Sequence, residues 1–138
     1  MLDTADVLAI HTLVALYGHI IDERQWSRLD ELFTADVTYE AGDFDLPTVH
    51  SLADLRALWT DPSARHPLAH HATNVVVSED ADGTVRVLSK GIGVGYGGRV
   101  GSVVYRDEIR LTPAGWRIAA RSVTLRRPPS APSPPRSG

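Results

Sequence analysis

The stretch that decides the fold is residues 101–123, which read GSVVYRDEIRLTPAGWRIAARSV. Two runs rich in β-branched and aromatic residues flank the short break Pro113–Gly115. Such runs, bounded by glycine and proline, are typical of strands, and a break of this length predicts a hairpin. We therefore expect antiparallel strands over residues 100–112 and 116–127.

Two more strands are expected immediately upstream. Residues 69–79 and 84–96 are the next β-type runs, and Asp80–Gly83 between them is a turn signal. The glycine-rich reversal at residues 97–99 then leads into the strand over 100–112. The second half of the chain thus predicts four strands joined by hairpins.

The first sixty residues have a helical pattern instead. Apolar residues recur at helical spacing over residues 3–21, and a shorter helix is expected around residues 26–33. A short strand over 36–40 and a third helix that opens at Ser51 follow. Helices before antiparallel strands predict an α+β domain, in which a helical layer covers one face of the sheet. The other face then needs water-tolerant residues or a partner subunit.

Composition bounds the class of protein. The 138 residues carry 43% hydrophobic and 22% charged side chains and a net charge of −3, which is ordinary for a globular domain and gives no footprint for nucleic acid. The absence of cysteine excludes disulfides, thiolate catalysis and cysteine-ligated zinc. No apolar run approaches the ~20 residues of a membrane span, and the N-terminus has no basic signal-peptide region. We expect a cytoplasmic protein with one domain, residues 1–127, and a disordered proline-rich tail, residues 128–138.

A literal G-x-G-x-x-G motif stands at Gly93–Gly98. A strand follows it, whereas the dinucleotide fingerprint needs a helix whose N-terminus meets phosphate, so we reject a nucleotide site. The alternate glycines from Gly91 to Gly97 leave one face of the strand bare, a feature found where another chain segment or a ligand comes close. We favour the chain segment.

Histidines gather at residues 66–71 without a metal-ligand pattern. His66 and His70 have the i, i+4 spacing of a helical chelate, but Pro67 lies between them in a run that enters a strand, so we expect no metal. Motifs for an activated nucleophile or a phosphate loop are also missing. Acid–base chemistry remains, and because neighbouring side chains on a strand face opposite ways, only one of His70 and His71 faces the interior.

Three stretches together resemble one family. They are YGHIIDERQWSRLDELFTADVTYE (residues 17–40), HHATNVVVSEDADG (residues 70–83) and the hairpin at 101–123 with its G-W-R-I-x-x-R piece. All three are similar to SnoaL-like proteins, in the superfamily of nuclear transport factor 2, scytalone dehydratase and ketosteroid isomerase. The resemblance implies a cone-shaped, curved antiparallel sheet (an α+β barrel) around a pocket that the first helix closes. It also implies a small hydrophobic ligand, no cofactor and a homodimer formed through the outer sheet face.

Site residues follow from the same resemblance. It implies His70 as general acid/base, Tyr17 as the group that polarises the substrate and Asp22 as the group that orients the histidine. Tyr17 and Asp22 lie about 140° apart on an ideal helix, so they converge only if the helix ends near residue 21. Four further residues are implied as substrate-binding: Tyr39, His71, Asn74 and Arg121.

Two of these assignments have alternatives. His70 shares its strand parity with Asn74, and His71 with two valines, which favours His70 for a polar cavity unless a bulge swaps the parity. Arg121 fits an anionic substrate group and a salt bridge on the sheet, with Asp107 or Glu108, equally well.

The sequence thus predicts an acid–base lyase or isomerase (dehydratase, isomerase or cyclase) that acts on a small cyclic hydrophobic carbonyl compound. One feature weighs against it, because residues 87–97 offer only Lys90 where several family enzymes carry a second acid or histidine. The alternatives are a non-catalytic module that binds a small molecule or a partner, and a scaffolding role like that of the β-subunits of ring-hydroxylating oxygenases.

Overall fold

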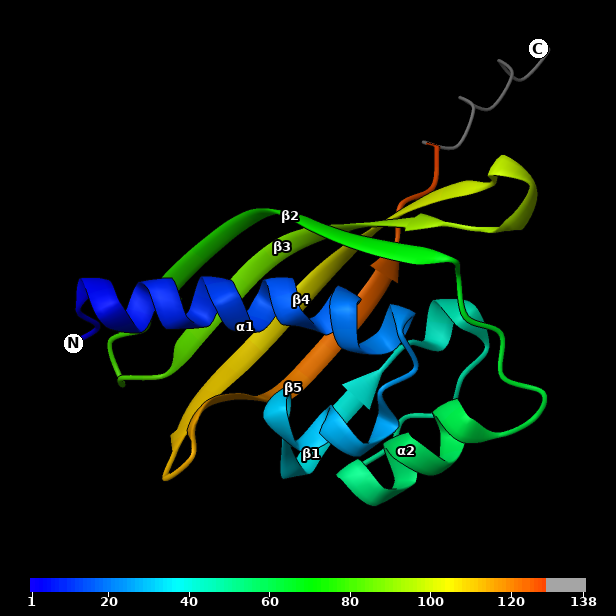
Figure 1. The fold of residues 1–138 in the computed structure, drawn as a ribbon. Helices are drawn as coiled ribbons and strands as arrows, with labels where there is room; N and C mark the ends of the chain where they lie inside the picture. The colour runs from blue at the N-terminus through cyan, green and yellow to red at the C-terminus, as the bar shows by residue number, and fades with distance from the viewer. Residues whose placement is uncertain (129–138) are drawn as a thin grey trace, which may run out of the picture.

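The computed structural model describes residues 1–128, so the tail predicted over 128–138 lies almost wholly outside the described residues. The order of elements is α1 (Thr4–Asp22), the 3₁₀ turn η1 (Trp26–Glu31), β1 (Phe33–Glu40), η2 (Gly42–Phe44), α2 (Leu52–Thr60), β2 (Ala69–Glu79), β3 (Val85–Val94), η3 (Tyr96–Gly98), β4 (Val100–Thr112) and β5 (Gly115–Leu125). Helices precede strands, which confirms the α+β class (Figure 1).

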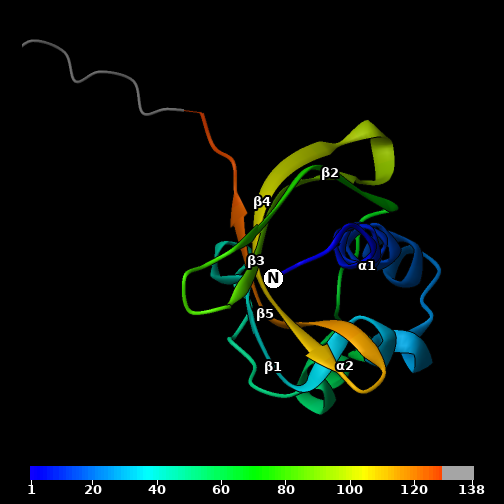
Figure 2. The ribbon, with the colours of Figure 1, turned by 90° about the vertical axis from the view of Figure 1, so that its left-hand side faces the viewer.

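One five-stranded sheet, in the order β1-β5-β4-β3-β2, forms the body of the protein. β2 to β5 pair antiparallel as predicted, whereas β1 pairs parallel with β5, so the sheet is mixed and open at both edges. The sheet curves around α1, which Figure 2 shows end-on against the concave face. The cone expected from the resemblance is therefore present as a cupped sheet and not as a closed barrel.

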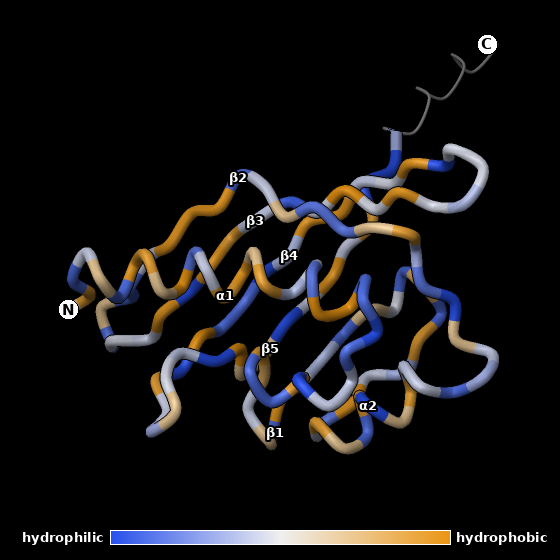
Figure 3. Tube along the Cα trace, viewed as in Figure 1, coloured by the Kyte–Doolittle hydropathy of each residue, from blue (hydrophilic) through white to orange (hydrophobic). Residues whose placement is uncertain are grey.

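α1 is the helix that covers the concave face. Asp3 caps its N-terminus in a reciprocal capping box with Asp6, which satisfies two backbone donors of the first turn. The buried residues of α1 are Ile10, Leu13, Val14, Tyr17, Gly18, Ile20 and Ile21. Figure 3 shows apolar segments along α1 and along the strands that it crosses. This pattern is that of a core helix.

By length and composition alone, α1 could span a membrane, since its 19 residues include a window of mean hydropathy 1.4. The polar residues that interrupt the apolar run, His11, Thr12 and His19, lie on the exposed side of the helix. In this structure the apolar side of α1 packs on β2 and β5.

A β-bulge in β2 decides which residues face the core. The β2–β3 register shifts between Thr73 and Val76, and Asn74 has a positive φ of 53°. The extra residue swaps the side-chain parity, so Ala72 on one side of it and Val75 on the other both pack against the core. His70 and the valines can therefore face inward together, and the parity argument that paired His70 with Asn74 was wrong.

Candidate active site

A pocket of about 830 Å³ opens between α1, α2 and the concave face of the sheet. Its lining is mostly apolar and aromatic, with polar groups from Tyr17, Tyr39 and His70. Such a cavity, concave and apolar with a few polar groups, has the size and character of a small-molecule site. The three residues come from three different elements, α1, β1 and β2, so the site exists only in the folded chain.

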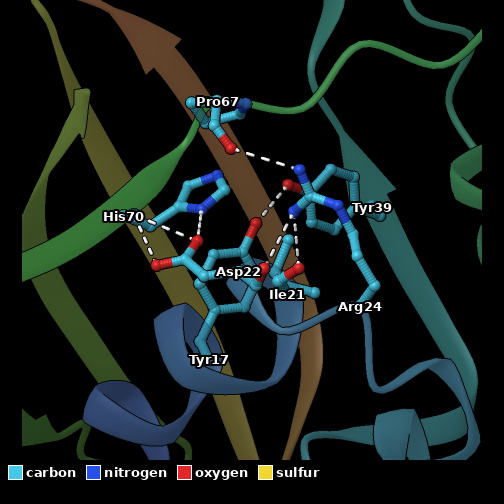
Figure 4. A network of polar contacts seen from close by, with 7 residues as sticks. All are labelled: Tyr17, Ile21, Asp22, Arg24, Tyr39, Pro67 and His70. Atoms are coloured by element: carbon cyan, nitrogen blue, oxygen red, sulfur yellow. Dashed lines mark hydrogen bonds and ion pairs between the residues drawn. The ribbon is translucent and has the colours of Figure 1, made fainter. Parts of the chain in front are cut away.

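His70 and Asp22 form the polar pair at the wall of this pocket (Figure 4). The Nδ1 atom of His70 lies 2.6 Å from Oδ1 of Asp22, and the backbone N–H of His70 donates to both carboxylate oxygens at 3.1 and 2.9 Å. Asp22 is the last residue of α1, so its side chain can leave the helix and reach the first residues of β2. One carboxylate thus fixes both the backbone and the ring of His70.

This contact sets the tautomer of His70. An ionised carboxylate can only accept, so Nδ1 carries the proton and Nε2 keeps its lone pair. Burial lowers the pKa of His70 below its usual value, and this outweighs the hydrogen bond and charge of Asp22, which raise it. His70 is therefore neutral at pH 7 and can accept a proton at Nε2.

Tyr17 and Tyr39 form a second polar pair in the pocket. Their hydroxyl oxygens lie 3.0 Å apart, and the Tyr17 ring meets the His70 ring edge-on at 5.7 Å. Burial raises the pKa of Tyr17 well above its usual value and that of Tyr39 to about 12. Both phenols stay protonated at neutral pH. Since one hydroxyl donates to the other, the second keeps its O–H for a ligand.

Arg121 lies beneath this pair and does not line the pocket. Its guanidinium donates to both oxygens of Asp107 at 2.7 Å, and both side chains have no exposed surface. The same group stacks between two rings, with Cζ 4.3 Å from the Tyr17 centroid and 4.2 Å from that of Tyr105. Of the two alternatives for Arg121, the structure therefore shows the salt bridge.

The structure divides the predicted site residues into two groups. Tyr17, Tyr39 and His70 line the pocket, and Asp22 holds His70 from outside the lining. His71, Asn74 and Arg121 do not line it, so their predicted contact with substrate is not supported: His71 is exposed on the other side of β2, and Asn74 lies in the bulge.

Sequence reasoning missed several lining residues. Trp59 and Tyr105 bring aromatic rings to the pocket, and His66 contributes a second imidazole that is bonded through Nε2 to the carbonyl of Trp59 at 2.9 Å. The sequence carried one signal for Tyr105, the bare face of the glycine strand. A Cβ on Gly91 would lie 2.4 Å from the Tyr105 ring, whereas Gly93 and Gly95 line the pocket. Gly91 thus makes room for another chain segment, as favoured from the sequence, whereas Gly93 and Gly95 border the pocket.

Within residues 1–128, no three histidine, aspartate or glutamate side chains gather as metal ligands would. The polar groups of the pocket interior are three phenols, from Tyr17, Tyr39 and Tyr105, and two imidazoles, of which His70 is bonded to a carboxylate. These groups donate, accept and move protons.

A curved sheet with a helix across its concave face, a deep apolar pocket and a carboxylate–histidine pair define a class of small α+β pocket proteins. Within that class, the chain belongs to the SnoaL-like domain family, whose family model matches residues 3–122.

Solved structures with the same fold extend over most of the chain. An NTF2-like protein with a cystatin-like fold from Novosphingobium aromaticivorans is 29% identical, with a TM-score of 0.69 over 88% of this chain and 82% of the other. A candidate aromatic ring hydroxylase from the same organism is 27% identical, with a TM-score of 0.70 over 93% and 94% of the two chains. A candidate scytalone dehydratase from this organism, 15% identical with a TM-score of 0.68 over 89% and 85%, shares the fold alone. No curated protein is similar enough to count as a match.

Proposed function

We propose that the protein is an acid–base enzyme, a dehydratase, isomerase or cyclase, that moves a proton on a small cyclic hydrophobic carbonyl compound without a cofactor. The observation that carries the proposal is the His70–Asp22 pair at the pocket wall, with a neutral imidazole whose Nε2 is free to accept a proton. A histidine oriented by a carboxylate is a common general base. Membership of the SnoaL-like family agrees with this chemistry and leaves the reaction open.

The mechanism begins with Nε2 of His70. It removes a proton from the carbon next to the carbonyl group, and the electrons of the broken C–H bond move onto the carbonyl oxygen. The free hydroxyl of the Tyr17–Tyr39 pair donates a hydrogen bond to this enolate oxygen. The imidazolium, stabilised by Asp22, then returns the proton to another carbon, as in an isomerase, or to a departing hydroxyl group, as in a dehydratase.

Deuterium exchange tests this step before the natural substrate is known. The protein should speed the exchange of α-protons for solvent deuterium in members of a panel of cyclic ketones, read by NMR. His70→Gln should slow the catalysed exchange by about 10²- to 10⁴-fold, the usual contribution of one general base. His71→Gln is the matched control, since this neighbouring histidine is exposed and lies outside the pocket lining. Equal exchange rates in wild type and His70→Gln would refute the proposal.

A second candidate function is a non-catalytic binding module. The observation in its favour is that the end of β3 and the residue after it present only glycines to the pocket, at Gly93 and Gly95, where a second acid or histidine would complete a proton relay. In that case ligands from the panel should stabilise the fold, by about 2.7 kcal/mol at a hundred times the dissociation constant, without any deuterium exchange. Thermal shift and NMR exchange on the same ligands separate the two functions.

A further inference from the structure

The mouth of the pocket differs in charge from its interior. Its rim is formed by the segment between α2 and β2 and by the β3–β4 hairpin, which Figure 1 shows at the same end of the molecule. Each segment contributes one arginine to the lining, Arg65 from the first and Arg99 from the second, and both residues are exposed. The rest of the rim is mostly apolar, and Phe44 and Val100 are exposed there.

Within residues 1–128, these two arginines have no carboxylate partner. Four other arginines of the chain do form ion pairs, namely Arg28, Arg86, Arg110 and Arg121. Among the residues that the structure describes, neither the Arg65 nor the Arg99 side chain takes part in an ion pair or a hydrogen bond; Arg99 bonds only through its backbone carbonyl, which accepts from the N–H of Gly95. Two guanidinium groups at the rim of an apolar pocket are therefore free to meet a ligand.

One acid also lines the mouth. Asp61 accepts from the backbone N–H and the hydroxyl of Ser63 at 2.8 and 2.5 Å, and these hydrogen bonds lower its pKa. Its carboxylate is thus ionised and already occupied by Ser63. The lining of the mouth then carries two positive charges against one negative charge, so it attracts an anion.

We propose that the pocket takes an anionic amphiphile, a cyclic apolar compound whose carboxylate, sulfonate or phosphate group lies at the mouth between Arg65 and Arg99. The apolar body fills the aromatic interior, and the uncharged polar end meets His70 and the Tyr17–Tyr39 pair. Guanidinium groups suit oxyanions because their N–H donors match the geometry of the anion. The orientation of the ligand rests on the function proposed above, whereas the charge preference of the mouth does not.

Two dyes that differ by one charged group test the inference. 8-Anilinonaphthalene-1-sulfonate is anionic, and N-phenyl-1-naphthylamine has the same skeleton without the sulfonate. Energy transfer from tryptophan reports the bound dye, because Trp59 lines the pocket. The double variant Arg65→Gln/Arg99→Gln should lower the affinity for the anionic dye by about five- to tenfold, as expected for two partly screened ion pairs. Its affinity for the neutral dye should stay unchanged. Added salt should lower the affinity for the anionic dye more in the wild-type protein than in this variant.

Two controls complete the experiment. Arg106→Gln removes an exposed arginine that lies outside this pocket, so it should leave both dyes unchanged. His70→Gln should keep the preference for the anionic dye, since that preference depends on the mouth and not on proton transfer. Equal losses for both dyes in the double variant, or an unchanged affinity for the anionic dye, would overturn the inference whatever the result of the exchange experiment.

Discussion

At the scale of single residues, Asp22 does more than accept one hydrogen bond. It binds the backbone N–H and the ring of the same histidine, so the imidazole has little freedom to turn. A carboxylate in the last turn of a helix is disfavoured by the helix dipole, which places negative partial charge there. The position of Asp22 therefore costs stability within α1, and its contact with His70 on the adjacent strand β2 explains why an acid stands there.

The pKa of His70 is the first prediction at this scale. Burial lowers it below the usual value of about 6.5, and Asp22 opposes this, so Asp22→Asn should lower it further. The Cε1–H resonance of His70, assigned by its loss in His70→Gln, should titrate accordingly in an NMR pH series. A pKa above 6.5 in wild type, or a rise in Asp22→Asn, would contradict the balance of burial and charge described here.

The same shift has a consequence for stability. Because the folded-state pKa of His70 lies below the unfolded value, the unfolded chain binds more protons as the pH falls through about 6.5. The His70 contribution therefore lowers the free energy of unfolding below that pH, down to the folded-state pKa. His70→Gln should remove this part of the pH dependence in urea unfolding curves recorded between about pH 7.5 and 5.

At the scale of elements, the site depends on how closely α1 approaches β2. Gly18 lies at the contact: a Cβ there would be 2.5 Å from the carbonyl oxygen of His70, which is backbone and cannot rotate away. The missing side chain lets the last turn of α1 lie on β2, and Asp22, one turn further on, then reaches His70. A glycine in a helix interior costs stability by itself, so its presence is explained by this approach.

Replacement of Gly18 should lower both the stability of the fold and the rate of deuterium exchange. Gly18→Ala should lower the free energy of unfolding by about 1–3 kcal/mol through overpacking, although alanine is the better helix former. It should also slow the deuterium exchange, because Asp22 moves with the end of α1. Gly42→Ala is the control, since a Cβ there meets nothing within 4 Å. A Gly18→Ala protein as stable as the wild-type protein would contradict this prediction, because α1 could then move away from β2 without a loss of stability.

Elements also show what the sequence could and could not predict. Strands over 69–79 and 100–112 were predicted with the bounds that the structure has, because turn residues mark both ends of each. The bulge at Asn74 was not predicted. A bulge is stable only when the side chains that it turns inward, here the valines of β2, fit the core, and the core exists only in the folded chain. Parallel pairing of β1 with β5 was missed for a similar reason: it joins segments far apart in the chain, and no local pattern encodes it.

The candidate site could be predicted from the sequence at the residues that belong to local motifs. The resemblance at H-x-x-T-N pointed to His70, and the Y-x-x-x-x-D spacing pointed to Tyr17 and Asp22. The ion pair between Arg121 and Asp107 was one of two open alternatives, and the β4–β5 register, which places the two residues opposite each other, decides it. Lining residues such as Trp59 carry no motif, and only the folded chain brings them to the pocket.

At the scale of the whole molecule, α1 packs on the concave face of the sheet, and the convex face presents exposed apolar residues on β2 and β3. Val76 on β2 and Leu88 on β3 are direct neighbours in the register and point away from the core, with exposed fractions of 57% and 47%. Ile92 on β3 faces the same way and is 38% exposed. We expect this surface, which we call the outer apolar patch (Val76, Leu88 and Ile92), to be the homodimer interface anticipated from the sequence.

Substitution of Leu88 by glutamate tests this expectation. In a two-fold dimer the same patch meets itself, so each interface would gain two negative charges taken out of water, a strongly unfavourable arrangement. Leu88→Glu should shift the mass measured by light scattering after gel filtration from dimer to monomer without a change in circular dichroism. Leu8→Glu is the matched control, because Leu8 is 68% exposed on α1, away from the outer face. A monomeric wild-type protein would show that there is no homodimer. A dimer that persists in Leu88→Glu and separates in Leu8→Glu would show that the interface lies elsewhere.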